Sequence, residues 1–173
     1  MTTSVTFRPI NLSFSNYRTY LLGFAFILGN LALPQLAHLV PDGGKILLPI
    51  YFFTLIAAYK FGLRVGLMTA ILSPVINSLL FGMPTASLLP VILIKSSLLA
   101  VAASVIASKS KKVSFAHLLA VVLFYQLIGA VAEYAITSSV SLALQDFRLA
   151  LPGMLIQIVG GWFILKAMAK YEF

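Results

Sequence analysis

Two ionisable side chains lie inside long apolar stretches of this sequence and are its first candidates for chemistry. Lys95 and Glu133 each lie about 8–11 Å, at 1.5 Å per residue, from helix ends that we expect to face outward. An unpaired charge at that depth costs a few kcal/mol, so each side chain requires a partner. The partner is either the other residue, in an ion pair between adjacent helices, or a bound ligand with a carboxylate or zwitterionic group. We favour the ligand.

Other polar side chains fall at similar depth. Gln126 precedes Glu133 by seven residues and shares its helix face. All of them lie in the middle or outer half of the predicted helices, whose inner halves are mostly Leu, Ile, Val, Ala and Phe. The pattern predicts a polar ligand pocket open to the outside, although the glutamines are also typical of interhelical hydrogen bonds and His38 of an interfacial histidine. The remaining candidates for this pocket are Asn77, Gln157, Gln35, His38 and Tyr51.

Several chemistries are excluded by what the sequence lacks. Without cysteine there is no disulfide, thiolate nucleophile, iron–sulfur cluster or thiolate zinc site. Neither a P-loop pattern nor a His-Glu-x-x-His metalloprotease pattern occurs. His38 and His117 are expected at opposite membrane faces, which excludes a bis-histidine haem. We therefore predict a protein that is not an enzyme and holds no metal or cofactor.

The elements that position these residues follow from composition. The 173 residues are 61% hydrophobic and 9% charged, whereas soluble domains carry about a quarter charged residues. One small domain cannot bury so much apolar surface internally, so the surrounding solvent is the lipid bilayer. The sequence predicts an all-α, polytopic integral membrane protein with a single transmembrane domain over residues 1–173.

Charge-free stretches and turn signals divide the chain into six predicted transmembrane helices that follow a cytoplasmic tail over 1–16. Gly82-Met83-Pro84 breaks a stretch that is too long for one span. A tight turn at Phe61-Gly62-Leu63 joins the second and third spans. The predicted spans cover residues 17–39, 46–61, 63–81, 87–107, 115–137 and 148–169.

Basic residues predict the orientation of these spans, because positively charged loops stay in the cytoplasm. Lys45 and Arg148 fall on one side, accompanied by Asp42 and Asp146. The opposite side holds Arg8, Arg18, Lys60, Arg64, Lys109, Lys111, Lys112, Lys166 and Lys170. Both termini are therefore expected in the cytoplasm. Basic residues split among short loops do not form one stripe, so no nucleic-acid binding is expected.

Small residues recur at helix-packing spacing. Ala25 and Gly29 pair in the first span, and Gly62, Gly66 and Ala70 line one face of the third. Such faces allow close approach of backbones in lipid. They indicate packing within the bundle or docking on a helical partner subunit.

Two further segments carry a resemblance to a known family. The first is Ile56-Ala-Ala-Tyr-Lys-Phe-Gly-Leu-Arg-Val-Gly-Leu-Met-Thr-Ala70, and the second is Ser73-Pro-Val-Ile-Asn-Ser-Leu-Leu-Phe-Gly82. Together with the size, basic character, short loops and six spans, they make nearly the whole chain similar to the substrate-binding S components of energy-coupling factor (ECF) vitamin transporters.

The resemblance implies a vitamin-like ligand bound near the outer face of a bacterial cytoplasmic (inner) membrane. It also implies that the first span docks, through an alanine-x-x-x-alanine motif, on a membrane coupling subunit driven by two ATPase subunits. The nearest equivalent of that motif here is Ala25-Phe-Ile-Leu-Gly29, with glycine in place of the second alanine.

The expected function is therefore that of a membrane subunit that binds a small water-soluble micronutrient for uptake, as part of an ECF-type ABC transporter. Two other classes of protein stay open. One is a small membrane enzyme acting on lipid or isoprenoid, which would be favoured by a cytoplasm-facing acidic metal cluster that the sequence lacks. The other is a structural subunit of a larger membrane complex.

Reporter fusions test the predicted topology. Fusions at Lys111 and at the C-terminus should report the cytoplasm, and a fusion near Gly43 should report the outside, because the basic loops hold their ends of the helices in the cytoplasm. An external C-terminus would mean an odd number of spans and would contradict the six-span topology.

Overall fold

The computed structural model describes residues 7–169, and the regular elements in this range are helical. Six helical segments are long and apolar enough to cross a membrane, which confirms the predicted all-α polytopic fold. In chain order they are α1 (Tyr17–Ala37), the segment Gly43–Phe61, α4 (Leu63–Phe81), α5 (Leu89–Ser110), α6 (Phe115–Thr137) and α9 (Leu151–Met168).

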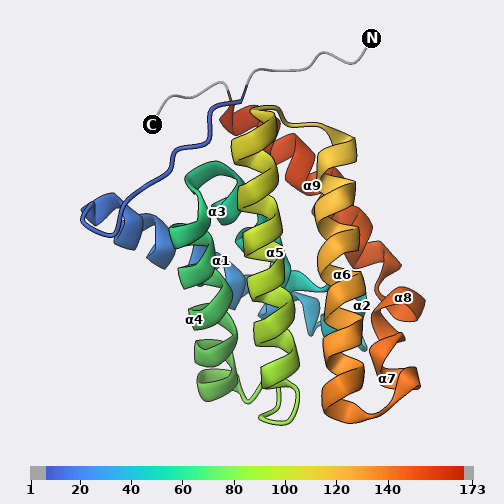
Figure 1. Ribbon diagram of the computed structural model, residues 1–173. Coiled ribbons are helices and arrows are strands. Elements are labelled where there is room, and N and C mark those ends of the chain that lie inside the picture. The colour runs from blue at the N-terminus through green and yellow to red at the C-terminus, as the bar shows by residue number, and fades with distance from the viewer. Residues whose placement is uncertain (1–6, 170–173) are drawn as a thin grey trace.

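Helix α3 (Phe52–Phe61) forms the centre of the bundle. It packs against α1, α4, α5 and α9, and eight of its ten residues are buried. Figure 1 shows α4, α5 and α6 side by side, with α1 and α9 behind them. The surrounding helices bury much smaller fractions of their residues and turn leucine, phenylalanine and valine side chains outward. Such apolar outer faces require lipid as their solvent.

The predicted turn between the second and third spans is present at Gly62. This residue has φ 87° and ψ −179°, a backbone conformation that is essentially restricted to glycine. A Cβ at this position would also lie 2.5 Å from Oδ1 of Asn11. The bounds of α4 agree with the prediction, and Gly66 of α4 packs directly against Ala58 of α3. Small residues on this face therefore serve packing within the bundle.

The predicted span over 46–61 is not one continuous helix. Its first part is α2 (Gly43–Leu47), which is followed by the 3-10 turn η1 (Pro49–Tyr51) and only then by α3. Leu48 interrupts the chain between α2 and η1 in a left-handed conformation, with φ 47° and ψ 48°. Pro49 has no backbone N–H to donate, which suits the first position of the 3-10 turn that it begins.

The last predicted span, over 148–169, also begins differently. Two short helices, α7 (Val140–Ala143) and α8 (Gln145–Leu149), lie between α6 and α9. Figure 1 shows both beside the lower ends of α6 and α9. Arg148, predicted as the first residue of the span, therefore belongs to α8, and α9 begins three residues later.

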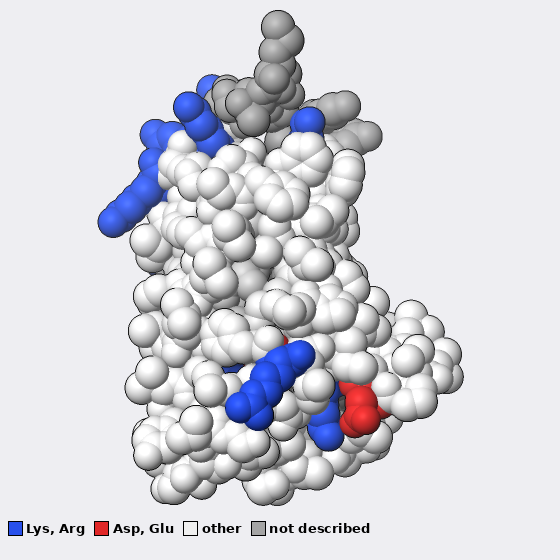
Figure 2. Space-filling view, turned by 90° about the vertical axis from the view of Figure 1, so that its right-hand side faces the viewer, with Lys and Arg blue, Asp and Glu red and all other residues white. Residues whose placement is uncertain are grey.

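The described part of the N-terminal tail is packed across the basic end of the bundle, where Figure 2 shows lysine and arginine side chains gathered at the top of the view. Phe7 is fully buried, its ring meets Tyr59 edge-on, and its N–H donates to the carbonyl of Lys111 over 2.9 Å. The Tyr59 hydroxyl donates to the carbonyl of Lys112 over 2.7 Å. Residues 1–6 of the predicted tail and Lys170 lie outside the described residues.

One buried amide joins α1 to the centre of the bundle. Asn30 of α1 donates through Nδ2 to Oγ1 of Thr54 over 3.0 Å and to Oγ of Ser73 over 3.3 Å, and its Oδ1 accepts from the N–H of Phe53 over 3.2 Å. Phe53 lies in the first turn of α3, where backbone N–H groups lack partners within the helix. Asn30 therefore satisfies the start of α3 and connects three helices.

Replacing Asn30 by alanine should lower the stability of the protein. The change leaves the Phe53 N–H and two hydroxyls buried without this partner, at a cost of about 1–3 kcal/mol. Thermal unfolding in detergent would measure the loss, with Asn11→Ala as the control because Asn11 is an exposed asparagine. Equal melting temperatures for Asn30→Ala and the wild type would show that this network contributes nothing to stability.

Candidate functional site

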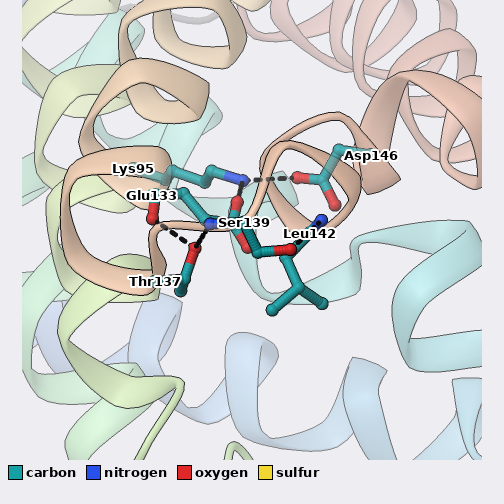
Figure 3. Close-up of polar contacts among 6 residues, drawn as sticks. All are labelled: Lys95, Glu133, Thr137, Ser139, Leu142 and Asp146. Carbon is teal, nitrogen blue, oxygen red and sulfur yellow. Dashed lines mark hydrogen bonds and ion pairs between the residues drawn. The ribbon is translucent and has the colours of Figure 1, made fainter.

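Three charged side chains meet in the interior between α5, α6 and α8. The ammonium of Lys95 is in direct ion-pair contact with Glu133 and donates to Oδ2 of Asp146 over 2.9 Å (Figure 3). Lys95 is only 3% exposed. The sequence predicted Lys95 and Glu133 at one depth, and the structure brings them together. It adds Asp146, which the sequence placed in an outer loop. These three residues are called the triad below.

A glycine on α6 makes room for the lysine. The side chain of Lys95 lies across Gly129, where a Cβ would come within 2.5 Å of its Cγ. Gly129 precedes Glu133 by one helical turn, so the aliphatic part of Lys95 passes over the glycine before its ammonium reaches the carboxylate. Any larger residue at 129 would displace the lysine from this path.

The turn after α6 carries Asp146 back to the triad. The helix ends at Thr137, whose hydroxyl donates to the carbonyl of Glu133 over 2.7 Å. The N–H of Ser139 donates to Oγ1 of Thr137, and Oγ of Ser139 accepts from the N–H of Leu142 at the start of α7. Figure 3 shows these bonds beside the triad. They fix the reversal that places α8, and with it Asp146, next to Lys95.

The triad has an unbalanced charge. One ammonium faces two carboxylates, which gives a net charge of −1 when all three are ionised. Of the described residues only Lys95 donates to these carboxylates, and it reaches one oxygen of each. The side chain of Glu133 is 11% exposed and that of Asp146 is 16% exposed, whereas the side chain of Lys95 is 3% exposed. The acidic side of the triad is therefore the accessible side.

Two tyrosines connect η1 and α6 to α9. The ring of Tyr51, in η1, lies 5.3 Å from the ring of Tyr125 on α6. The hydroxyl of Tyr125 donates to Oε1 of Gln157 over 2.9 Å. The predicted candidates Tyr51 and Gln157 are therefore joined through Tyr125, which lies on the same helix as Glu133.

Several polar atoms in this region have no partner. Gln126 is 1% exposed, yet neither its Oε1 nor its Nε2 forms a hydrogen bond within residues 7–169. Nε2 of Gln157 and Oγ of Ser96, next to Lys95, are unsatisfied in the same way. Buried polar atoms of native proteins are nearly always hydrogen-bonded to protein, water or ligand. We call Ser96, Tyr51, Tyr125, Gln126, Gln157 and the triad together the polar cluster.

Three predicted site residues have their contacts elsewhere. Nε2 of Gln35 donates to Oδ1 of Asn77 over 3.3 Å, which joins α1 to α4. His38 is exposed, and its ring lies over Gly44 beyond the end of α1. Gln35 therefore forms an interhelical hydrogen bond and His38 lies at the surface, which were the alternative interpretations of these two residues. Asn77, predicted only as a site residue, is the partner of Gln35.

Sequence reasoning missed Asp146, Tyr125 and Ser96. A signal existed for Tyr125, because it precedes Glu133 by eight residues and neighbours Gln126, which places it on the buried face of α6. Nothing in the spacing indicated that Asp146 turns inward. Its placement depends on the two short helices before α9, which the sequence did not predict.

An apolar cleft of about 250 Å³ lies apart from these polar residues. It opens between the end of α1, the break at Pro49 and α9. Its lining contains none of the predicted site residues. The lining residues are Leu33, Leu36, Ala37, Leu47, Pro49, Phe52 and Ile156.

Within residues 7–169 no group of three or more histidine, aspartate or glutamate side chains is placed to hold a metal ion. Comparison with protein-family models, curated proteins and solved structures finds no match. The fold and the site thus define a multi-pass helical membrane protein with a buried, acidic polar cluster.

Substitutions in the triad should lower the stability of the protein by different amounts. Lys95→Met leaves two carboxylates buried without their cation and should destabilise the protein by about 3–5 kcal/mol. Glu133→Gln should cost less, because Lys95 keeps Asp146. The Lys95→Met, Glu133→Gln double variant should recover part of the loss, and adding Asp146→Asn should recover more.

Thermal unfolding in detergent would rank these variants. Lys45→Met is the matched control, because Lys45 forms an exposed pair with Asp42 and surface pairs contribute little to stability. If Lys95→Met melted with the control, the triad would have no role in holding α5, α6 and α8 together.

Proposed function

We propose that this chain is the substrate-binding subunit for uptake of a small water-soluble micronutrient, a vitamin or related compound. The observation that carries the proposal is Gln126, a fully buried amide without a protein partner inside a bundle of apolar helices. Burying such a group without hydrogen bonds costs free energy, which a polar ligand at the cluster would offset. A purely structural subunit has no need of this arrangement.

The polar cluster offers the kinds of contact that a small polar molecule needs. Gln126 presents one donor and one acceptor group, Gln157 a donor, and the triad a pair of carboxylates beside an ammonium. The rings of Tyr51 and Tyr125 pack against each other, and the Tyr125 hydroxyl bonds Gln157. A few placed polar groups within an apolar surrounding are typical of small-molecule sites.

The energising partners follow from the sequence resemblance. We propose an ECF-type ABC transporter in the bacterial cytoplasmic membrane, in which α1 docks on the membrane coupling subunit that two ATPase subunits drive. The two residues proposed for docking are placed differently in the structure. Ala25 is exposed on α1, whereas Gly29 lies against the ring of Phe53, which a Cβ would approach to 2.7 Å. Docking through this motif would therefore use the face of Ala25.

Copurification and uptake test this proposal in one set of variants. Gently solubilised wild-type protein should release a small polar molecule on denaturation, detected by mass spectrometry. Gln126→Leu should fold normally, because no protein hydrogen bond is lost, but should release little of it. Gln35→Leu is the matched control, since Gln35 bonds Asn77 outside the polar cluster. Ala25→Phe should retain the molecule yet abolish uptake, because a bulky side chain blocks helix docking.

Uptake should require coexpressed coupling and ATPase subunits, and the purified chain should not hydrolyse ATP. Ala120→Phe, at an exposed alanine on α6, controls for bulk at a lipid-facing position. Protein that neither releases nor binds any small molecule would contradict the binding function. Robust accumulation by this chain alone would contradict the partners and indicate a solitary transporter.

A further inference from the structure

The charge of the triad carries information about the ligand. Two carboxylates and one ammonium lie in the interior of an apolar bundle, and uncompensated charge is costly there. Arg148, two residues from Asp146, is exposed and forms no ion pair with the described carboxylates. With all three groups ionised, the described residues therefore leave one negative charge of the triad without a partner.

We propose that the polar cluster binds a ligand with one positively charged amine. Both carboxylates, of Glu133 and of Asp146, contact this amine. The proposal rests on the proposed function, because it takes the cluster to be the substrate site. It names the chemical class of that substrate as a cationic, amine-bearing polar molecule.

Each carboxylate of the triad keeps one oxygen without a protein donor among the described residues. Lys95 bonds Oε2 of Glu133 and Oδ2 of Asp146, so Oε1 and Oδ1 accept nothing from the side chains of residues 7–169. Figure 3 shows both carboxylates converging on the Lys95 ammonium. An amine with several N–H donors would bridge the two free oxygens and form charge-assisted hydrogen bonds.

The unpartnered amide extends the site along α6. Gln126 lies on the same buried face as Glu133 and seven residues before it, which corresponds to about 10 Å along the helix axis. Gly129 lies between the two, and the aliphatic part of Lys95 covers it. A ligand that places its amine at the carboxylates would therefore need a second polar group, a donor or an acceptor, to satisfy Gln126.

An anionic ligand fits the triad poorly. It would bring a third negative charge to an ammonium that already pairs with two carboxylates. The presence of Asp146 thus reverses the preference for a carboxylate ligand that Lys95 and Glu133 alone suggested. A zwitterion remains compatible only through its ammonium group.

Matched probes of opposite charge test this inference on the full-length protein in detergent. Tryptamine and histamine should raise the melting temperature of the wild type, whereas indole-3-acetate and imidazole-4-acetate should not. Asp146→Asn should fold normally, because the Lys95–Glu133 pair stays balanced. It should bind the amines roughly ten- to a hundred-fold more weakly, since one charge-assisted hydrogen bond is lost. Arg148→Gln, which removes an exposed charge nearby, should bind them as the wild type does.

The outcomes separate this inference from the proposed function. Stabilisation by the acids instead of the amines would overturn the ligand class while leaving a small-molecule site in place. Undiminished amine binding by Asp146→Asn would also overturn it, because Asp146 would then make no contact with the amine. If no probe shifts the melting temperature, the copurified molecule decides: a basic nitrogen in it supports the inference and its absence overturns it. Absence of both binding and a copurified molecule would contradict the proposed function itself.

Discussion

Burial of the Lys95 ammonium constrains the structure around it. An isolated ammonium in the interior of an apolar bundle is costly, so carboxylates must be brought to it. Glu133 comes from the neighbouring helix, at a position that α6 determines by its own geometry. Asp146 comes from α8, which requires the chain to reverse after α6 and form two short helices before it enters α9. Gly129 must remain small so that the lysine can cross α6.

The apolar surroundings also restrict where irregular backbone can occur. In lipid, backbone groups must be satisfied within the protein, and helices that face lipid therefore run without breaks. The break at Leu48 and Pro49 lies at buried positions, and it brings Tyr51 against Tyr125. At the other side of the bundle core, Asn30 satisfies the start of α3 that the break creates. Buried polar side chains thus compensate for backbone that departs from a continuous helix.

Local sequence signals predicted much of the fold because they act within a single helix. Gly62 ends α3 in a conformation that only glycine adopts readily, and the bounds of α4 and α6 followed from charge-free stretches with clear turn residues. The break at Leu48 was missed because a leucine with positive φ has no signal of its own. The helices α7 and α8 were missed because they are too short for hydrophobic periodicity to reveal them.

The sequence by itself determined that this is a six-helix membrane protein and that Lys95, Glu133 and Gln126 face its interior. Composition requires an apolar solvent, and helical spacing places residues on a face, so both are local properties. The tertiary structure alone decided which charges meet. It paired Lys95 with a second carboxylate from α8 and joined Gln157 to Tyr125, while Gln35 found Asn77 instead. These partners lie more than thirty residues apart in the chain, and the path of the intervening backbone, which no local pattern encodes, sets the distance between them.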